Sequence, residues 1–217
     1  QPNCPITYRD GYLYTVFWNA ETRKANFVCL SVTDEDPAQE KEQKIAAWSH
    51  TGNGFYWAGA YVAENYLIVT TDDGAIGYTE GHGEILSLDP RTGSVLDRMT
   101  ARGVGDLRSS VCYDDRTGCC YFTSKGGDFY RVVLSEDGKL LSQTLLHLTN
   151  GSDDPATPPM STSTPVVYRG RAYVGVSGTS QFGAYSGHNI TVIDLAAWRV
   201  AYTVPTQGYP QTSGLLT

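Results

Sequence analysis

Two glycine-rich stretches carry side chains that are suited to binding a ligand. Residues 71–83 and 177–189 each contain a Gly-His pair near their end, and this places His82 and His188 just before a predicted strand, with Tyr185 shortly upstream of His188. Long glycine-rich loops on a rigid scaffold are common binding elements, and imidazole is a frequent metal ligand. The alternative, which we favour, is that each His opens a strand and bonds a neighbouring backbone carbonyl.

A second set of connections carries aromatic side chains and an arginine. These connections join one repeat of the chain to the next, and they contain Tyr56, Trp57, Arg108 and Tyr209. Aromatic area combined with a few polar groups is typical of a ligand site. No motif for a catalytic residue occurs in the sequence. We therefore predict ligand binding, without catalysis, at Trp57, Tyr56, Arg108, His82, His188, Tyr185 and Tyr209.

Two pairs of aspartates are the candidates for a metal site. Asp72, Asp73, Asp153 and Asp154 could supply oxygen ligands to calcium, but neither pair has the spacing of an EF-hand loop. The sequence leaves the identity of such a metal open. Zinc is not expected, because the chain has no Cys-x-x-Cys motif and its four histidines are scattered.

The five cysteines do not form a disulfide framework, because their number is odd. Most of them fall on predicted strands, where cysteine packs as a small apolar residue. Cys119 and Cys120 are adjacent, and successive strand residues point to opposite faces of a sheet. We predict that this pair is reduced.

A repeat of about 53 residues positions all of these side chains. A shared strand-opening motif recurs, with its second residue at positions 11, 65, 118 and 170, which are 54, 53 and 52 residues apart. Each copy contains four short runs rich in β-branched and aromatic residues, separated by tight turns. Repeats of this length built from strands are typical of propeller blades. The sequence thus predicts an all-β propeller of about four four-stranded antiparallel blades.

The repeats divide the single propeller region, residues 1–217, at approximately 1–50, 51–103, 104–157 and 158–205. Residues 206–217 are predicted to begin a further blade, since Ser213 follows Ser163 by 50 residues. The first repeat already has its own first strand, so this segment is surplus to a ring of four. We expect an open arc that is part of a larger propeller, with unpaired blade edges that invite self-association.

The repeat also predicts which loops share a face. Connections between blades and connections between second and third strands emerge at the same end of every blade. Trp57, Arg108, His82 and His188 should therefore lie on one side of the molecule, with the two Gly-His loops directed to one cleft.

Two stretches resemble the quinoprotein-type (PQQ-like) propeller repeat. Residues 164–174, followed by Ile193-Asp194, and residues 85–96 follow its course from a Pro-containing first strand through Gly-x-x-Tyr to an Asp-x-x-Thr-Gly turn. The closing Trp of the family pattern is missing from the second repeat, and the third repeat lacks the Asp-x-x-Thr-Gly turn. The resemblance implies the propeller fold; use of the family's cofactor does not follow from it.

Composition narrows the class of partner. The net charge of −7 and the pI near 5.0 argue against nucleic acid, whose phosphates require clustered Lys and Arg. No apolar run approaches the roughly 20 residues of a membrane helix. The chain begins at Gln1 without Met, which predicts a processed secreted protein or an excised domain. We therefore expect a bacterial protein located outside the cell or on its surface.

Two functions fit these observations. The first is a non-catalytic scaffold that binds protein, peptide or glycan through loops on one face, and it needs no cofactor. The second is a fragment of a quinoprotein-type, PQQ-dependent oxidoreductase, in which Arg108 and Trp57 would hold an anionic quinone and calcium would be required. We favour the scaffold, because no motif places the carboxylate that the metal would need.

Overall fold

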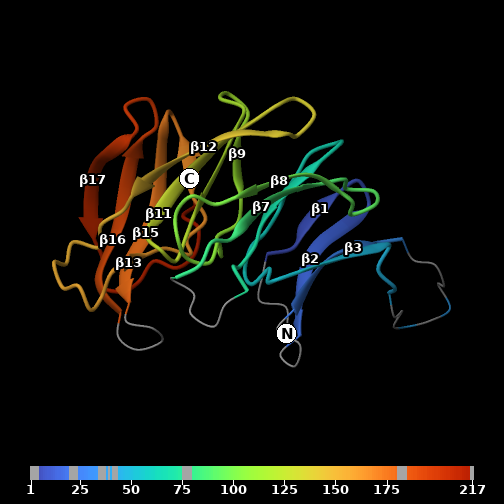
Figure 1. The fold of residues 1–217 in the computed structure, drawn as a ribbon, viewed down its shortest axis with the longest axis horizontal. Coiled ribbons are helices and arrows are strands. Elements are labelled where there is room, and N and C mark those ends of the chain that lie inside the picture. The colour runs from blue at the N-terminus through green and yellow to red at the C-terminus, as the bar shows by residue number, and fades with distance from the viewer. Residues whose placement is uncertain are drawn as a thin grey trace.

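The fold was analysed in a computed structural model that describes residues 5–19, 24–33, 38, 40, 44–74, 80–179 and 185–215 (Figure 1). All regular structure in these segments is β-strand, and none of them forms a helix. None could therefore provide a helix long and apolar enough to cross a membrane.

The described residues form seventeen strands in four antiparallel sheets, each of which is one blade. The first blade contains β1 (Thr7–Arg9), β2 (Tyr12–Asn19), β3 (Lys24–Ser31) and β4 (Trp48–Gly52). The second contains β5 (Tyr61–Val62), β6 (Leu67–Thr70), β7 (Glu84–Leu88) and β8 (Val95–Thr100). The third contains β9 (Cys112–Asp114), β10 (Cys119–Thr123), β11 (Asp128–Leu134) and β12 (Leu140–His147). The fourth contains β13 (Pro159–Met160), β14 (Val166–Tyr168), β15 (Arg171–Thr179), β16 (Tyr185–Asp194) and β17 (Arg199–Pro205).

The prediction of successive four-stranded antiparallel blades is confirmed. In the first three blades the strands pair in chain order, and in the fourth β13 and β14 both pair with β15. The motif residues occupy the same register in every blade. Each lies opposite a residue of the strand that precedes it in the chain, in the pairs Tyr14–Thr7, Ile68–Tyr61, Tyr121–Cys112 and Tyr173–Val166.

The core consists of three apolar clusters, one between each pair of successive blades. The clusters contain, for example, Phe27 and Leu67 between blades one and two, Phe122 between blades two and three, and Tyr121 between blades three and four. A closed ring of four blades would need a fourth cluster between the last blade and the first. The described residues form no such cluster, so the four blades make an open arc, with blade one and blade four at its two ends (Figure 1).

Tryptophans fix two of the interfaces between blades. Trp48 of blade one donates its indole N–H to the carbonyl oxygen of Pro90 in blade two at 2.8 Å and packs where a side chain at Gly93 would stand. Gly93 has a φ of 71°, so glycine suits both the turn and the close approach of the ring. Trp198 of blade four donates to the carbonyl of Leu145 in blade three at 3.3 Å.

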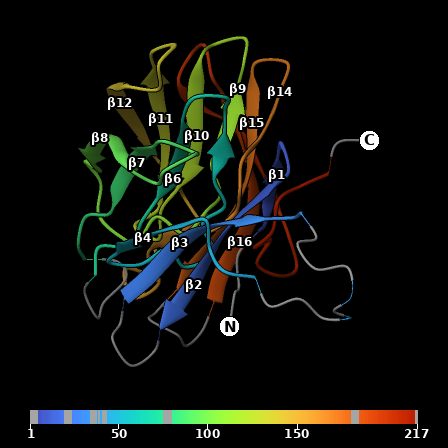
Figure 2. The ribbon, with the colours of Figure 1, turned by 90° about the vertical axis from the view of Figure 1, so that its right-hand side faces the viewer.

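Residues 206–215 follow β17 and contain no strand (Figure 2). The carbonyl oxygen of Pro210 lies against Gly175 of β15, the counterpart of Thr123 in β10, which donates its hydroxyl to the carbonyl of Ser163 at 3.0 Å. This segment therefore matches the stretch that leads into a blade. Residues 216 and 217, the end of the segment predicted to begin a further blade, lie outside the described residues.

The described cysteines are all free thiols, as predicted for Cys119 and Cys120. These two neighbours pack on opposite faces of β10: Cys119 belongs to the cluster between blades three and four, and Cys120 to the cluster between blades two and three. Cys4 lies outside the described residues.

Candidate functional site

Four loops converge at one end of blades two and three. They carry Tyr56 and Trp57 between β4 and β5, Asp72 after β6, Arg108 between β8 and β9, and Lys125 between β10 and β11. Backbone hydrogen bonds join the loops: the amide of Asp72 donates to Gly54 at 2.8 Å, and the amide of Lys125 donates to Asp106 at 3.0 Å. The loops therefore support one another as a single structure.

Arg108 is the centre of this loop cluster. Its Nε lies 3.1 and 3.2 Å from the two carboxylate oxygens of Asp72, and its Nη2 lies 2.8 Å from Oδ2 of the same residue. Nη2 also lies 2.7 Å from Oδ2 of Asp106. The side chains of Arg108, Asp72 and Asp106 are only 14%, 12% and 2% exposed. Charge-assisted pairs with this planar geometry fix a guanidinium in one orientation.

Burial shifts the pKa values of the surrounding charges. Burial and the neighbouring Asp72 raise the pKa of Asp106 to about 7, against the opposing effect of Arg108. Burial also raises the pKa of Asp72, although Arg108 opposes the shift. Lys125 is 6% exposed, and burial together with Arg108 lowers its pKa to about 8. The cluster thus contains an acid and a base that both titrate close to neutral pH.

Two aromatic rings cover the charges. The ring centroids of Tyr56 and Trp57 are 4.8 Å apart, and the Arg108 guanidinium carbon lies 4.8 Å from the Tyr56 centroid and 5.7 Å from that of Trp57. The Lys125 ammonium lies 5.9 Å from the Trp57 ring. Both aromatic side chains are partly exposed, whereas the charges beneath them are mostly buried. We call Tyr56, Trp57, Arg108 and Lys125 the aromatic platform.

The backbone of Trp57 is itself unusual, because its φ is 68° in a residue that is not glycine. A bulky side chain in this region costs about 1–3 kcal/mol and persists where the surroundings impose it. Here the adjoining cation–π contacts and loop hydrogen bonds hold the residue. Of the four residues predicted to share a face, Trp57 and Arg108 are in contact.

The two Gly-His histidines lie outside the platform and have local partners. His82 is exposed, and its Nδ1 lies 3.0 Å from the carbonyl oxygen of Gly103. His188 Nδ1 lies 2.9 Å from the hydroxyl of Ser177 on the neighbouring strand. His82 thus contacts a backbone carbonyl, as the structural interpretation expects, whereas the partner of His188 is a side-chain hydroxyl. Part of each Gly-His loop, residues 75–79 and 180–184, lies outside the described residues, so the prediction that both loops reach one cleft stays a prediction.

The other predicted binding residues are on blade four. The amide of Thr162 donates to the hydroxyl of Tyr209 at 2.8 Å. The hydroxyls of the same two residues are 3.0 Å apart. This contact attaches the segment after β17 to blade four, so Tyr209 has a structural role there. Tyr185 begins β16, but its side chain is not among those that the structure describes.

The predicted metal candidates separate into two places. Asp72 pairs with Arg108, and the amide of Asp73 donates to a carboxylate oxygen of Asp106 at 3.2 Å. Asp153 and Asp154 are exposed in the loop after β12, where Asp154 accepts from the amide of Ala156 at 2.9 Å. Among the described residues, no three His, Cys, Asp or Glu side chains gather in a metal-binding arrangement.

Sequence reasoning missed Lys125 and the ion-pair partner of Asp72. Lys125 occupies the turn between second and third strands of blade three, the same connection that carries the Gly-His loop in blade two. The rule that equal connections share a face could have identified it. Asp72 is one of the four metal candidates of the sequence, and nothing in the sequence shows that Arg108, 36 residues further on, reaches its carboxylate.

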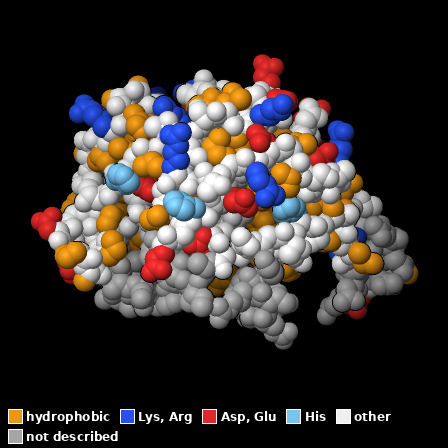
Figure 3. Space-filling model, in the orientation of Figure 1, with side chains coloured by type: hydrophobic (Ala, Val, Ile, Leu, Met, Phe, Trp, Pro, Cys, Tyr) orange, Lys and Arg blue, Asp and Glu red, His pale blue; other side chains and the backbone are white. Residues whose placement is uncertain are grey.

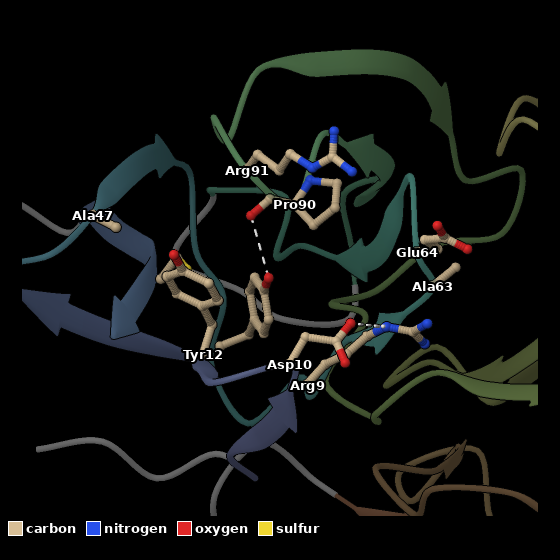
Figure 4. A pocket seen from close by; sticks show the side chains of 10 residues that line it. Arg9, Asp10, Tyr12, Ala47, Ala63, Glu64, Pro90 and Arg91 are labelled. Atoms are coloured by element: carbon tan, nitrogen blue, oxygen red, sulfur yellow. Dashed lines mark hydrogen bonds and ion pairs between the residues drawn. The ribbon is translucent and has the colours of Figure 1, made fainter. Parts of the chain in front are cut away.

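A cavity of about 450 Å³ opens on blades one and two, at the end of the blades that lies away from the aromatic platform (Figure 4). Tyr12, Tyr14 and Pro90 line it, with Arg9, Asp10, Glu64 and Arg91 around it. Arg9 is held by Asp10 at 3.2 Å and by the carbonyl of Val62 at 3.0 Å, and the Tyr14 hydroxyl donates to Pro90 at 3.3 Å. The positive and negative groups are mixed, so this cavity favours no single class of ligand.

The face of the molecule seen in Figure 3 shows no large patch of side chains of one charge. Acidic, basic and histidine side chains are interspersed with small apolar patches (Figure 3). A nucleic-acid site would require clustered Lys and Arg. This face offers no such cluster.

Comparison with known proteins identifies the fold. No protein-family model matches the chain, and no curated protein matches it. Among solved structures, BamB from Moraxella catarrhalis superposes with a TM-score of 0.58 at 13% identity, over 94% of this chain and 51% of BamB. The quinohemoprotein alcohol dehydrogenase from Comamonas testosteroni gives 0.58 at 11%, over 94% and 35%. The C-terminal domain of Pseudomonas aeruginosa PilY1 gives 0.57 at 16%, over 88% and 47%.

These similarities confirm the PQQ-like β-propeller fold that the repeats predict. At such low identity they carry the fold and no activity. The chain spans about half the length of BamB and of the PilY1 domain, and about a third of the dehydrogenase.

Proposed function

We propose that the chain is a non-catalytic propeller scaffold that binds a protein, a peptide or a glycan through the aromatic platform. The observation that carries this proposal is the pairing of partly exposed Tyr56 and Trp57 with a fixed layer of buried charge. Tyr, Trp and Arg dominate the residues that contribute most to protein interfaces. A location outside the cell or on its surface belongs to the same proposal.

The geometry favours binding because the platform is preorganised. Arg108 is already paired with Asp72 and Asp106, and the loops that hold the rings share backbone hydrogen bonds. A partner that stacks on Trp57 would therefore order few new side chains, which lowers the entropic cost of association. A protein or peptide is the favoured partner, and a glycan is the alternative that an aromatic ring also serves.

The residues present do not fit the quinone of the oxidoreductase alternative. An anionic quinone would need a cation to pair with, but two aspartates occupy the Arg108 guanidinium. We therefore assign no step to PQQ.

Two measurements test the proposal against this alternative. The first is selection from a phage-displayed random peptide library and a printed glycan array, with the wild-type chain and with Trp57→Ala. Tyr168→Ala is the control, because Tyr168 is an exposed aromatic residue at the end of β14, away from the aromatic platform. We expect enriched binders that Trp57→Ala loses and Tyr168→Ala keeps. The second is titration with PQQ and calcium. A saturable change in quinone absorbance would favour the oxidoreductase and contradict our proposal.

A further inference from the structure

Asp106 joins three of the loops that converge at the platform end of blades two and three. Its carboxylate Oδ1 accepts a hydrogen bond from the amide of Asp73, in the loop after β6, at 3.2 Å. Its Oδ2 lies 2.7 Å from Nη2 of Arg108, which belongs to the same loop as Asp106. Its backbone carbonyl accepts the amide of Lys125, in the turn between β10 and β11, at 3.0 Å. Asp106 is therefore the junction of the connections beneath the aromatic platform.

Both carboxylate oxygens of Asp106 are occupied by protein donors, and the side chain is only 2% exposed. An ionised carboxylate accepts hydrogen bonds only, whereas a protonated carboxyl group is a donor at one of its oxygens. A proton on Oδ1 would face the N–H of Asp73, and a proton on Oδ2 would face the guanidinium of Arg108. Two donors cannot bond each other, so protonation of Asp106 must break one of the two contacts.

The contact with Asp73 is the weaker of the two. A hydrogen bond from a charged donor is shorter and roughly twice as strong as one from a neutral amide. The two distances follow this order, with 2.7 Å to Arg108 and 3.2 Å to Asp73. The proton therefore takes Oδ1, and the loop after β6 loses its bond to Asp106. The carboxylate of Asp72 keeps its own pair with Arg108, so the change is a local opening that begins at Asp73.

The opening reaches the loop that holds Trp57. The amide of Asp72, next to Asp73, donates to the carbonyl oxygen of Gly54 at 2.8 Å, and Gly54 belongs to the same loop as Trp57. Trp57 has a φ of 68°, a conformation that persists only where the surroundings impose it. When the loop after β6 has lost its bond to Asp106, it imposes this conformation less firmly. The ring of Trp57 should thus gain freedom when Asp106 is protonated.

Four charged groups surround Asp106 and set the pH at which its two forms exchange. Asp72 and Asp73 carry the same charge as Asp106, and Arg108 and Lys125 carry the opposite charge. Burial and the charge of Asp72 raise the pKa of Asp106 to about 7, while Arg108 and the amide of Asp73 oppose the rise. Both forms are therefore populated near neutral pH, with the ionised form in excess above the pKa and the protonated form in excess below it.

We propose that Asp106 is a proton-operated latch of the aromatic platform: its ionised form joins the loop after β6 to Arg108, and its protonated form releases that loop. The platform is fixed in the ionised form and looser in the protonated form. The consequence for binding rests on the proposed function: a partner should bind more tightly at pH 8 than at pH 6, because a fixed surface loses less entropy on association. The latch itself operates without a partner, so the two claims can fail separately.

Amide hydrogen exchange, followed by NMR in the full chain, tests the latch without a ligand. The protection of the Asp73 amide, corrected for the exchange rate of an unstructured peptide at the same pH, should be at least about tenfold lower at pH 6 than at pH 8. The carboxyl carbon signal of Asp106 should titrate with a midpoint of about 7, and the indole N–H signal of Trp57 should shift with the same midpoint. The indole of Trp198, which bonds Leu145 between blades three and four, should not follow it.

Three variants identify the titrating group. The side chain in Asp106→Asn has a donor in place of one acceptor oxygen, as the protonated acid has, so the Asp73 amide should be poorly protected at both pH values. Lys125→Met should keep the pH dependence. Asp194→Asn, the matched control, should keep it too, because Asp194 accepts the amide of Ala197 at 2.9 Å in a turn of blade four.

The outcomes that overturn the proposal are specific. One is equal protection of the Asp73 amide at pH 6 and pH 8 in the wild type, and another is a pH dependence that persists in Asp106→Asn. Different midpoints for the Asp106 carbon and the Asp73 amide in the wild type also overturn it, and this comparison decides the matter even where Asp106→Asn does not fold.

Discussion

Replacing Arg108 by Leu should destabilise the fold strongly, and the loss should depend on pH. Arg108 is the ion-pair partner of both Asp72 and Asp106, whose side chains are 12% and 2% exposed. Removing it leaves two buried carboxylates with Lys125 as the nearby cation. Breaking a buried pair by removing one partner costs about 3–5 kcal/mol, and we expect a loss in this range at pH 8.

Protonation of the aspartates should reduce this loss. The pKa of Asp106 is already raised to about 7, and the substitution removes the charge that opposes the rise. A group whose folded pKa lies above its unfolded value binds protons more tightly in the folded state, so folding is favoured as the pH falls. The cost of Arg108→Leu should therefore fall to less than half its pH 8 value at pH 5.

Urea unfolding followed by tryptophan fluorescence measures both values. Arg98→Leu is the control, because Arg98 is 59% exposed and lies 3.5 Å from Glu84; an exposed pair of this kind is worth about 0–1 kcal/mol. A loss below about 1 kcal/mol at pH 8 would show that the buried pairs do not hold the loops. An equal loss at both pH values would refute the assignment of a raised pKa to Asp106.

Three further substitutions or treatments probe separate parts of the structure. His188→Ala should cost about 0.5–1.5 kcal/mol in urea unfolding, through loss of the contact with Ser177, and should not change ligand binding; a change in binding with unaltered stability would contradict the structural role. Because burial lowers the pKa of Lys125 to about 8, stability should rise with pH between about 8 and 10 relative to a Lys125→Met variant; parallel pH profiles would show that this lysine titrates normally. Burial raises the pKa of Cys120, so Cys120 and buried Cys119 should react with a thiol reagent only after unfolding, and fast modification of either in the native chain would contradict their packing.

Most of the fold could be predicted from the repeat. A strand-opening motif at constant spacing placed Tyr14, Ile68, Tyr121 and Tyr173 in equal register, because a blade is a local unit whose strands pair in chain order. The same rule placed Trp57 and Arg108 at one end of the arc. Local spacing could not show that two aspartates neutralise Arg108, because side-chain pairing across 36 residues depends on how the blades pack.

The two histidines show that equal sequence positions do not by themselves establish a joint site. A Gly-His pair at equal positions in two blades drew attention to a joint ligand site, yet His82 bonds Gly103 and His188 bonds Ser177. Equal sequence positions share an end of their blades without having to converge. Loop residues of neighbouring blades meet where their loops lean across the interface, as those of Arg108 and Trp57 do.

The central claim is that Trp57 forms the contact surface for a partner, and one affinity ratio tests it most directly. Isothermal titration calorimetry with the strongest peptide or glycan selected by the wild-type chain should be repeated with Trp57→Ala and Tyr168→Ala. Loss of a Trp at the centre of an interface costs about 2 kcal/mol or more, so we expect Trp57→Ala to weaken binding at least about 30-fold. Tyr168→Ala should bind within a factor of about two of the wild type. Equal affinities of the wild type and Trp57→Ala would contradict the account.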